Sequence, residues 1–183
     1  MILTEEIMKD AGCCDPGVNR YFNDGDNKEY EASELLELAI EREDYSDAGY
    51  AMSKLMTKLR RVEWSVYCAR EVLSIFEGKF PNDFRPRKAI EAAERYLSNP
   101  TASAANAASA ADSAANADSA ANAAYAANSA AYAADSAANA AYTAYAAAYT
   151  AYAADSAANA ANAEKPIYPS LLRKGLEILL TGD

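Results

Sequence analysis

The chain contains no histidine, and this absence removes a group of familiar reactions and switches. Catalytic triads, Cys-His nucleophile pairs, histidine metal ligation and histidine pH switching all need an imidazole. Only three cysteines are present, Cys13 beside Cys14 and Cys68 alone, so neither a CxxC pair nor a four-ligand zinc spacing occurs. We therefore expect no metal, no cofactor and no enzymatic activity, and an odd set of thiols suits a reducing cytoplasm.

Basic residues are also scarce relative to acidic ones. The chain has 17 Lys and Arg against 27 Asp and Glu, a net charge of −10, and its sequence pI is near 4.6. Such a chain is repelled by phosphate backbones and anionic lipid surfaces, so we expect neither nucleic acid nor a membrane as partner. The N-terminus lacks a signal-peptide pattern. The acidic balance favours a protein partner that is itself basic.

The charge is unevenly distributed. Residues 1–47 hold 14 acids and 4 bases, whereas residues 48–100 hold 6 acids and 10 bases. One interpretation is that the two halves face each other or that both are solvated helix faces. The other is an acidic docking surface, for which the candidate residues are Glu29, Glu31, Glu34, Glu37, Glu41, Glu43, Asp44 and Asp47.

Glycine is rare, with seven in 183 residues, and few stretches alternate β-branched with polar residues. Apolar residues instead recur at helical spacing, so we expect an all-α protein with a compact helical module. The first expected helix spans 29–43, and the second is capped by Ser46 or Asp47 and reaches Leu59. A third covers 62–76, and a fourth is capped by Asp83 and ends at Asn99-Pro100. A last helix follows Pro166. The last helix carries Leu171, Leu172, Leu176, Ile178, Leu179 and Leu180, and should dock on the core.

An alanine-rich repeat occupies residues 101–163, with 36 alanines among 63 positions and neither glycine nor proline. Alanine is the strongest helix former, so the repeat is predicted to be helical. One unbroken helix would be about 95 Å long at 1.5 Å per residue, so a hairpin with its turn near 115–124 is the favoured arrangement. The chain is thus divided into 1–100, 101–163 and 164–183, and the alanine faces could also join two copies in a homo-oligomer.

A motif occupies residues 64–95 and includes Trp64-Ser65-Val66-Tyr67-Cys68-Ala69-Arg70, Phe76-Glu77, Phe80-Pro81-Asn82-Asp83 and Arg85-Pro86-Arg87-Lys88-Ala89-Ile90-Glu91-Ala92. It resembles the immunity proteins similar to immunity protein five of bacterial and phage genomes, whose members often continue into alanine-rich repeats. The resemblance implies an all-α inhibitor that neutralises a toxin. Phe84 departs from the relatives, in which this position is commonly acidic.

The charged residues of the motif allow two interpretations. Opposite charges usually satisfy each other, which favours a salt-bridged corner between two helices, while a binding patch is the alternative. The residues concerned are Arg70, Glu77, Asp83, Arg85, Arg87 and Glu91, together with Trp64 from the same motif.

Three functions follow from these patterns. The leading one is a non-enzymatic inhibitor, of the immunity or phage anti-defence type, that binds a toxin, nuclease or defence effector through its acidic surface. The alternative is a pocket for a small nucleotide signal, lined by tyrosines and by Arg70, Arg85, Arg87 and Lys88. The third, a metal-dependent hydrolase using Asp24, Asp26 and Glu29, lacks a positioned base.

Overall fold

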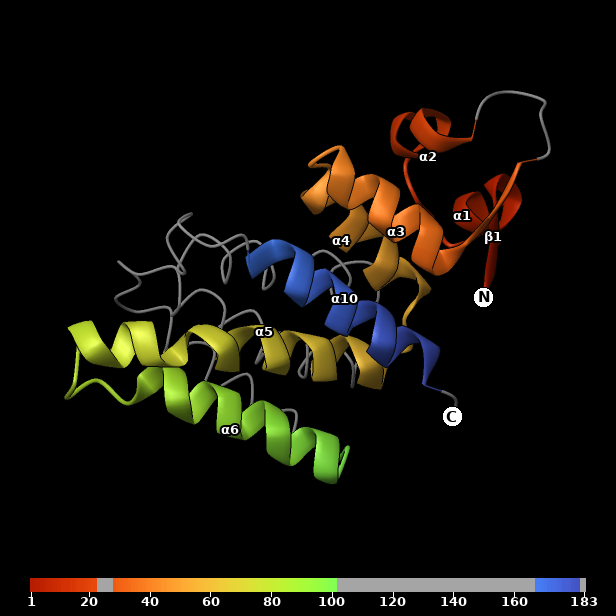
Figure 1. Cartoon of the computed structure of the whole chain (residues 1–183). Helices are drawn as coiled ribbons and strands as arrows, with labels where there is room; N and C mark the ends of the chain where they lie inside the picture. Colours follow the sequence, from red (N-terminus) through yellow and green to blue (C-terminus); the bar gives the residue numbers. More distant parts are fainter. Residues whose placement is uncertain (23–27, 102–166, 182–183) are drawn as a thin grey trace.

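A computed structural model describes residues 1–22, 28–101 and 167–181 of the chain (Figure 1). Within these residues the protein is helical apart from one two-stranded sheet, which confirms the predicted all-α class. The elements are β1 Ile2–Thr4, α1 Glu5–Asp10, α2 Asp15–Tyr21, β2 Glu29–Glu31, α3 Ala32–Glu41, α4 Tyr45–Leu55, α5 Lys58–Lys79, α6 Arg85–Ser98 and α10 Ile167–Leu180. The predicted alanine-rich helix or hairpin falls almost entirely on residues 102–166, outside the described ranges.

Residues 1–22 and 28–31 form a small N-terminal layer made of β1, α1, α2 and β2. The two strands pair antiparallel, with Leu3 opposite Tyr30. The prediction of one helix from residue 29 is therefore wrong at its start, because residues 29–31 hydrogen-bond to β1 and the helix begins at Ala32. Leu3, Met8, Val18 and Phe22 are buried beneath this layer together with residues of α3. The layer thus has a small hydrophobic cluster of its own.

The second predicted helix ends earlier than expected. Helix α4 stops at Leu55, Met56 turns to extended backbone with a ψ of 146°, and Leu59 lies in α5 with 43% of its surface exposed. The side chain of Arg61 stabilises this break, because its Nε donates to the carbonyl oxygen of Ser53 at 2.8 Å. A cation that binds the last carbonyls of a helix also interacts favourably with the helix dipole.

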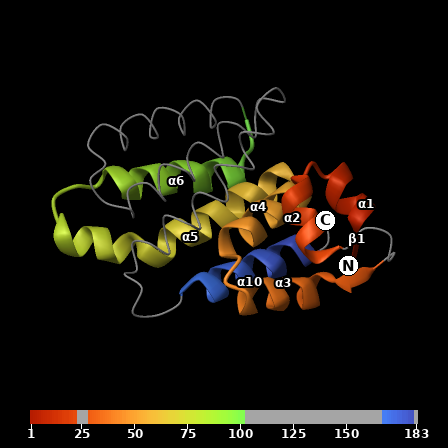
Figure 2. The same ribbon diagram turned by 90° about the horizontal axis from the view of Figure 1, so that it is seen from above.

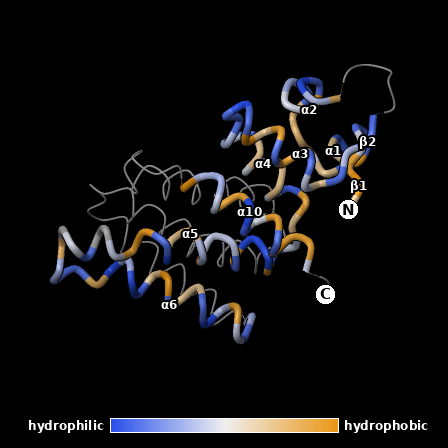
Figure 3. The backbone as a smooth tube through the Cα atoms, in the orientation of Figure 1, coloured by the Kyte–Doolittle hydropathy of each residue, from blue (hydrophilic) through white to orange (hydrophobic). Residues whose placement is uncertain are grey.

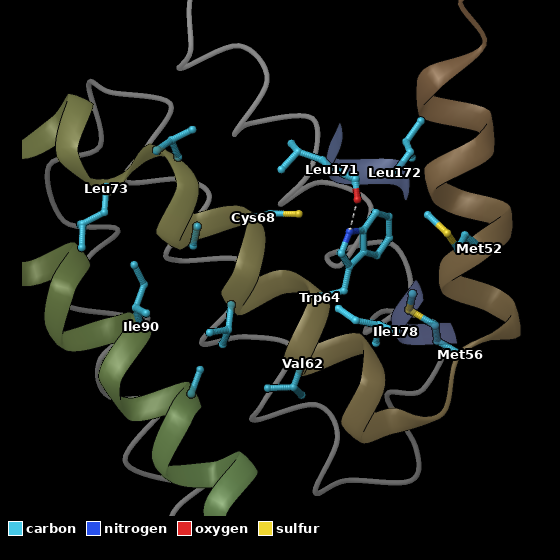
Figure 4. Packing of buried hydrophobic residues seen from close by; sticks show 14 of the residues in the cluster. Met52, Met56, Val62, Trp64, Cys68, Leu73, Ile90, Leu171, Leu172 and Ile178 are labelled. Atoms are coloured by element: carbon cyan, nitrogen blue, oxygen red, sulfur yellow. Dashed lines mark hydrogen bonds between the residues drawn. The ribbon is translucent and has the colours of Figure 1, made fainter. Parts of the chain in front are cut away.

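Trp64 lies at the centre of the main core, between α4 and α10 (Figure 4). Its side chain is fully buried, and its indole Nε1 donates to the carbonyl oxygen of Leu171 at 2.9 Å. Helix α10 approaches the ring so closely that a Cβ on Gly175 would lie 2.7 Å from Trp64 Cε2. Glycine is therefore required on α10 at the point of closest approach.

Helix α10 joins parts of the chain that are far apart in sequence. It contacts α3, α4 and α5, and α5 lies between α10 and α6 (Figure 1). Viewed from above, α3 and α10 lie along one side of the molecule and α6 along the other (Figure 2). Tyr168 of α10 stacks on Tyr45 of α4 with ring centroids 4.9 Å apart, and Arg60 Nη1 donates to the carbonyl oxygen of Leu179 at 2.6 Å. No helix in the described ranges is long and apolar enough to cross a membrane.

Candidate functional site

The charged residues of the motif form ion pairs where α5 meets α6. Arg87 donates to Glu77 through Nε and Nη2, both at 2.7 Å. Arg70 binds Glu94 in the same bidentate way, at 2.8 and 2.7 Å. The sequence singled out Glu91, but Glu94 lies one helical turn further along α6 and is the carboxylate that Arg70 holds. Spacing alone does not distinguish two glutamates three residues apart on one helix.

Asp83, just before α6, forms a further ion pair with Arg85. Its Oδ1 accepts from both the backbone N–H and the Nε of Arg85, at 3.1 and 2.9 Å, although the N-cap residue is Phe84 rather than Asp83. Hydrogen bonds from Arg85 hold the pKa of the Asp83 carboxyl below its ordinary value.

This pairing bears on the nucleotide alternative. Arg70, Arg85 and Arg87 each hold a carboxylate with two donors, so a phosphate would first have to displace it. Trp64 of the motif is fully buried in the core and does not lie on the surface. Two of the three carboxylates considered for a metal-dependent hydrolase, Asp24 and Asp26, lie outside the described residues. The third, Glu29, is exposed in β2.

The acidic candidates lie along β2, α3 and the turn into α4, and all but Asp44 are exposed. Several already have partners. Glu31 accepts from the N-terminal amine at 3.2 Å, and Glu34 accepts from the backbone N–H of Glu31 at 3.2 Å. Glu37 binds Arg173 of α10 at 2.7 and 2.6 Å, which lowers the pKa of Glu37. The acidic surface is therefore partly neutralised by the protein's own cations.

Asp44 and Asp47 belong to a cluster that attaches α2 to the start of α4, and we call it the α2 clasp. Arg20 Nη1 donates to Asp44 Oδ1 at 2.9 Å and to Asp47 Oδ2 at 2.6 Å, while the Tyr21 hydroxyl donates to Asp44 Oδ2. The Arg42 guanidinium lies 5.0 Å from the centre of the Tyr21 ring. No local sequence signal connects α2 to this turn, so sequence reasoning missed Arg20 and Tyr21.

The clasp changes the proton affinity of its members. The hydrogen bond from Tyr21, followed by the contact with Arg20, lowers the pKa of the Asp44 carboxyl. Burial, followed by the hydrogen bond to Asp44, raises the pKa of the Tyr21 hydroxyl. At neutral pH the clasp therefore holds a carboxylate, a neutral phenol and a guanidinium.

Glu41 and Glu43 form what we call the acidic turn, which lies at the hydrophilic end of α3 (Figure 3). Both carboxylates are exposed, and within the described ranges neither has a hydrogen-bond or ion-pair partner. Helix α3 ends in a Schellman motif, in which Glu43 N donates to Ile40 O at 3.1 Å and Asp44 N donates to Ala39 O at 2.9 Å. Glu43 takes the left-handed position of that motif with a φ of 59°.

Among the described residues, a cavity of about 90 Å³ lies where the N-terminal layer meets α3, α4 and α10. Its walls are largely hydrophobic, with Val18 and Phe22 from α2 and Leu35 from α3 among them. Tyr21 and Asp47 of the α2 clasp also line it, as do the half-buried Cys13 and the exposed Cys14. Burial raises the pKa of the Cys13 thiol.

Comparison with known proteins gives one match. Residues 35–179 match a protein family whose description is "Family of unknown function (DUF6931)". No curated protein and no solved structure matches the chain. The matched range begins within α3 and ends within α10, so it includes the Trp64 core, the ion pairs of α5 and α6 and the acidic turn. Since it spans well over half of the sequence, the chain belongs to this family of unknown function, DUF6931.

Proposed function

We propose that this protein is a non-enzymatic inhibitor that binds a basic partner protein through its acidic turn. It would act in the cytoplasm as an immunity or phage anti-defence protein. The observation that carries the proposal is Glu43, an exposed carboxylate without a described partner that occupies a left-handed backbone position. The motif of residues 64–95, which resembles immunity proteins, supports the same class.

The backbone at Glu43 is the first argument. Left-handed backbone costs a non-glycine residue about 1–2 kcal/mol, and glycine is the residue usually found at this place in a Schellman motif. Strained backbone of this kind is concentrated at functional sites. Because glycine would form this turn more easily, the presence of glutamate favours a functional role for its side chain over a purely structural role in the turn.

The surrounding charge is the second argument. Glu34, Glu37 and Glu41 follow one another at helical spacing along the exposed side of α3, and only Glu37 has a cationic partner among the described residues. A toxin or effector that acts on nucleic acid needs a basic surface to bind phosphate. An acidic surface attracts such a partner, speeds its association and loses this advantage as salt rises.

The test is a pull-down that compares three forms of the full chain as bait. One is wild type, and one carries Glu41→Lys with Glu43→Lys in the acidic turn. The third is a matched control with the same change of charge, Glu63→Lys with Glu71→Lys, at two exposed positions of α5. Each protein recovered would be quantified at low and at high salt, then purified and assayed with and without the wild-type chain.

We expect a basic protein that wild type and the α5 control retain at low salt and that the acidic-turn variant loses. Its own activity should fall when the wild-type chain is added in equimolar amount. If no retained protein depends on Glu41 and Glu43, the acidic turn is not the binding surface. If a dependent partner keeps full activity in the complex, the protein binds without inhibiting.

A further inference from the structure

The cavity beneath α2 is large enough to hold more than water. Its volume is about 90 Å³, whereas a single water needs only about 10–15 Å³. Small side chains on neighbouring helices leave this space, with Ala39 on α3 and Ala48 and Ala51 on α4. Larger hydrophobic side chains surround it, including Phe22 of α2 and Leu176 of α10.

The wall offers little for a water molecule to bind. In the described part of the chain, no buried side-chain nitrogen or oxygen lacks a hydrogen-bond partner. Two polar side chains of the wall are also engaged, since Tyr21 donates to Asp44 and Asp47 accepts from Arg20. This leaves the Tyr50 hydroxyl as a polar group of the wall without a hydrogen-bond partner among the described residues. A buried water is stable only with two to four polar partners, whereas an empty apolar cavity binds apolar guests.

The wall also carries no cationic side chain. Its one carboxylate, Asp47, is paired with Arg20. The thiol of Cys13 stays protonated at neutral pH because burial raises its pKa. One cation lies just outside the wall, since Lys54 Nζ is 5.2 Å from the ring centre of the wall residue Tyr50 and its charge acts on the Cys13 thiol. The wall itself offers a carboxylate or phosphate group no cationic side chain, which favours a neutral ligand.

We propose that this cavity is a binding site for a small, neutral, apolar molecule. A cavity of about 150 Å³ holds benzene, so the present one suits a guest of about three to five carbon atoms. The roof, which includes Val18 and Phe22, belongs to the N-terminal layer, and the matched family range begins only at residue 35. The site is thus formed by joining this layer to the family core, and it is independent of the acidic turn.

The four methionines of the chain can report ligand binding in the protein without any substitution. Met8 and Met52 line the cavity, whereas Met1 is exposed at the N-terminus and Met56 is buried elsewhere in the main core. With carbon-13 in the methionine methyl groups, cyclopentane would be titrated into the full chain and followed by NMR. We expect a saturable shift at Met8, a smaller one at Met52, and none at Met1 or Met56.

Two outcomes would overturn the proposal. One is the absence of a saturable shift at Met8, and the other is an equal shift at all four methionines, which indicates non-specific partition. Cyclopentanecarboxylate serves as the charged counterpart, and we expect it to leave Met8 unchanged. If it binds as well as cyclopentane, the assignment of a neutral ligand is wrong.

A variant that fills the cavity gives an independent test. Ala51→Leu places a larger side chain in the cavity, and Ser33→Leu adds the same side chain on the exposed face of α3 as the matched control. Cyclopentane should raise the melting temperature of wild type and of the Ser33 variant, because a ligand that binds only the folded state stabilises it. The Ala51 variant should lose this shift, and retention of the shift would place the ligand elsewhere. If that variant does not fold, the Met8 titration decides alone.

Discussion

At the scale of single residues, Glu43 combines a strained left-handed backbone with an exposed side chain. The end of α3 would be easier to form with glycine at position 43, because glycine adopts positive φ without the steric penalty of a Cβ atom. The chain has glutamate instead, next to Asp44, whose carboxylate holds Arg20 and Tyr21 rather than capping α4. Both acids are therefore unusual for the turn they occupy.

Replacing Glu43 by glycine is expected to stabilise the protein by about 1 kcal/mol, because the left-handed strain is relieved. Urea denaturation should show a higher midpoint with an unchanged slope. Glu41→Gly is the control, because Glu41 is two residues earlier and is the last residue of α3, where glycine should destabilise the protein by about 1 kcal/mol. A Glu43→Gly variant no more stable than wild type would show that this turn carries no strain.

At the scale of helices, packing around Trp64 depends on how closely each neighbour approaches the indole ring. On α10, a Cβ at Gly175 would lie 2.6 Å from Met52 Cε and 2.7 Å from Trp64 Cε2. On α4, a Cβ at Gly49 would lie 3.6 Å from Trp64 Cη2, which is an ordinary contact. The two glycines face the same ring, but only Gly175 leaves no room for a Cβ atom.

Alanine at these two positions should therefore change stability in opposite directions. Gly175→Ala overpacks a fully buried ring and is expected to destabilise by about 1–3 kcal/mol. Gly49→Ala has room and replaces glycine within a helix, so it should stabilise by about 0.5–1 kcal/mol. Thermal or urea unfolding followed by the fluorescence of the single tryptophan measures both. The close approach of α10 is contradicted if both variants shift in the same direction.

At the scale of the whole molecule, an N-terminal layer is attached to a helical core by two means. Hydrophobic residues such as Val18 and Phe22 pack beneath the layer around the cavity, and the α2 clasp joins Arg20 and Tyr21 to Asp44 at its edge. The clasp contains a titrating group, so the attachment is expected to depend on pH.

The variant Asp44→Asn tests this dependence. The folded protein lowers the pKa of Asp44 below its ordinary value of 3.8, so the unfolded state binds the proton more tightly. The ionised carboxylate thus contributes stability that is fully present above pH 3.8 and is lost as the pH falls through the lower, folded-state pKa. Asp44→Asn should be less stable than wild type at pH 7, and the difference should shrink in strong acid. A difference independent of pH would mean that charge does not hold the clasp.

The sequence by itself determined the helical class and most helix positions, because helix formation depends on neighbours three or four residues apart. The end of α6 follows from Asn99-Pro100 in this way, whereas its N-cap is Phe84 and not the expected Asp83. Leu59 was misplaced because the break after α4 depends on Arg61, which binds a carbonyl eight residues back.

Only the tertiary structure decided which charges pair, where the small sheet forms and where the cavity lies. Arg173 holds Glu37 from 136 positions away, and β1 draws residues 29–31 out of the predicted helix. The cavity arises because alanines of α3 and α4 meet the underside of α2. These features depend on contacts between segments distant in the chain, and the free energy of such contacts is set by burial and geometry that no local pattern contains.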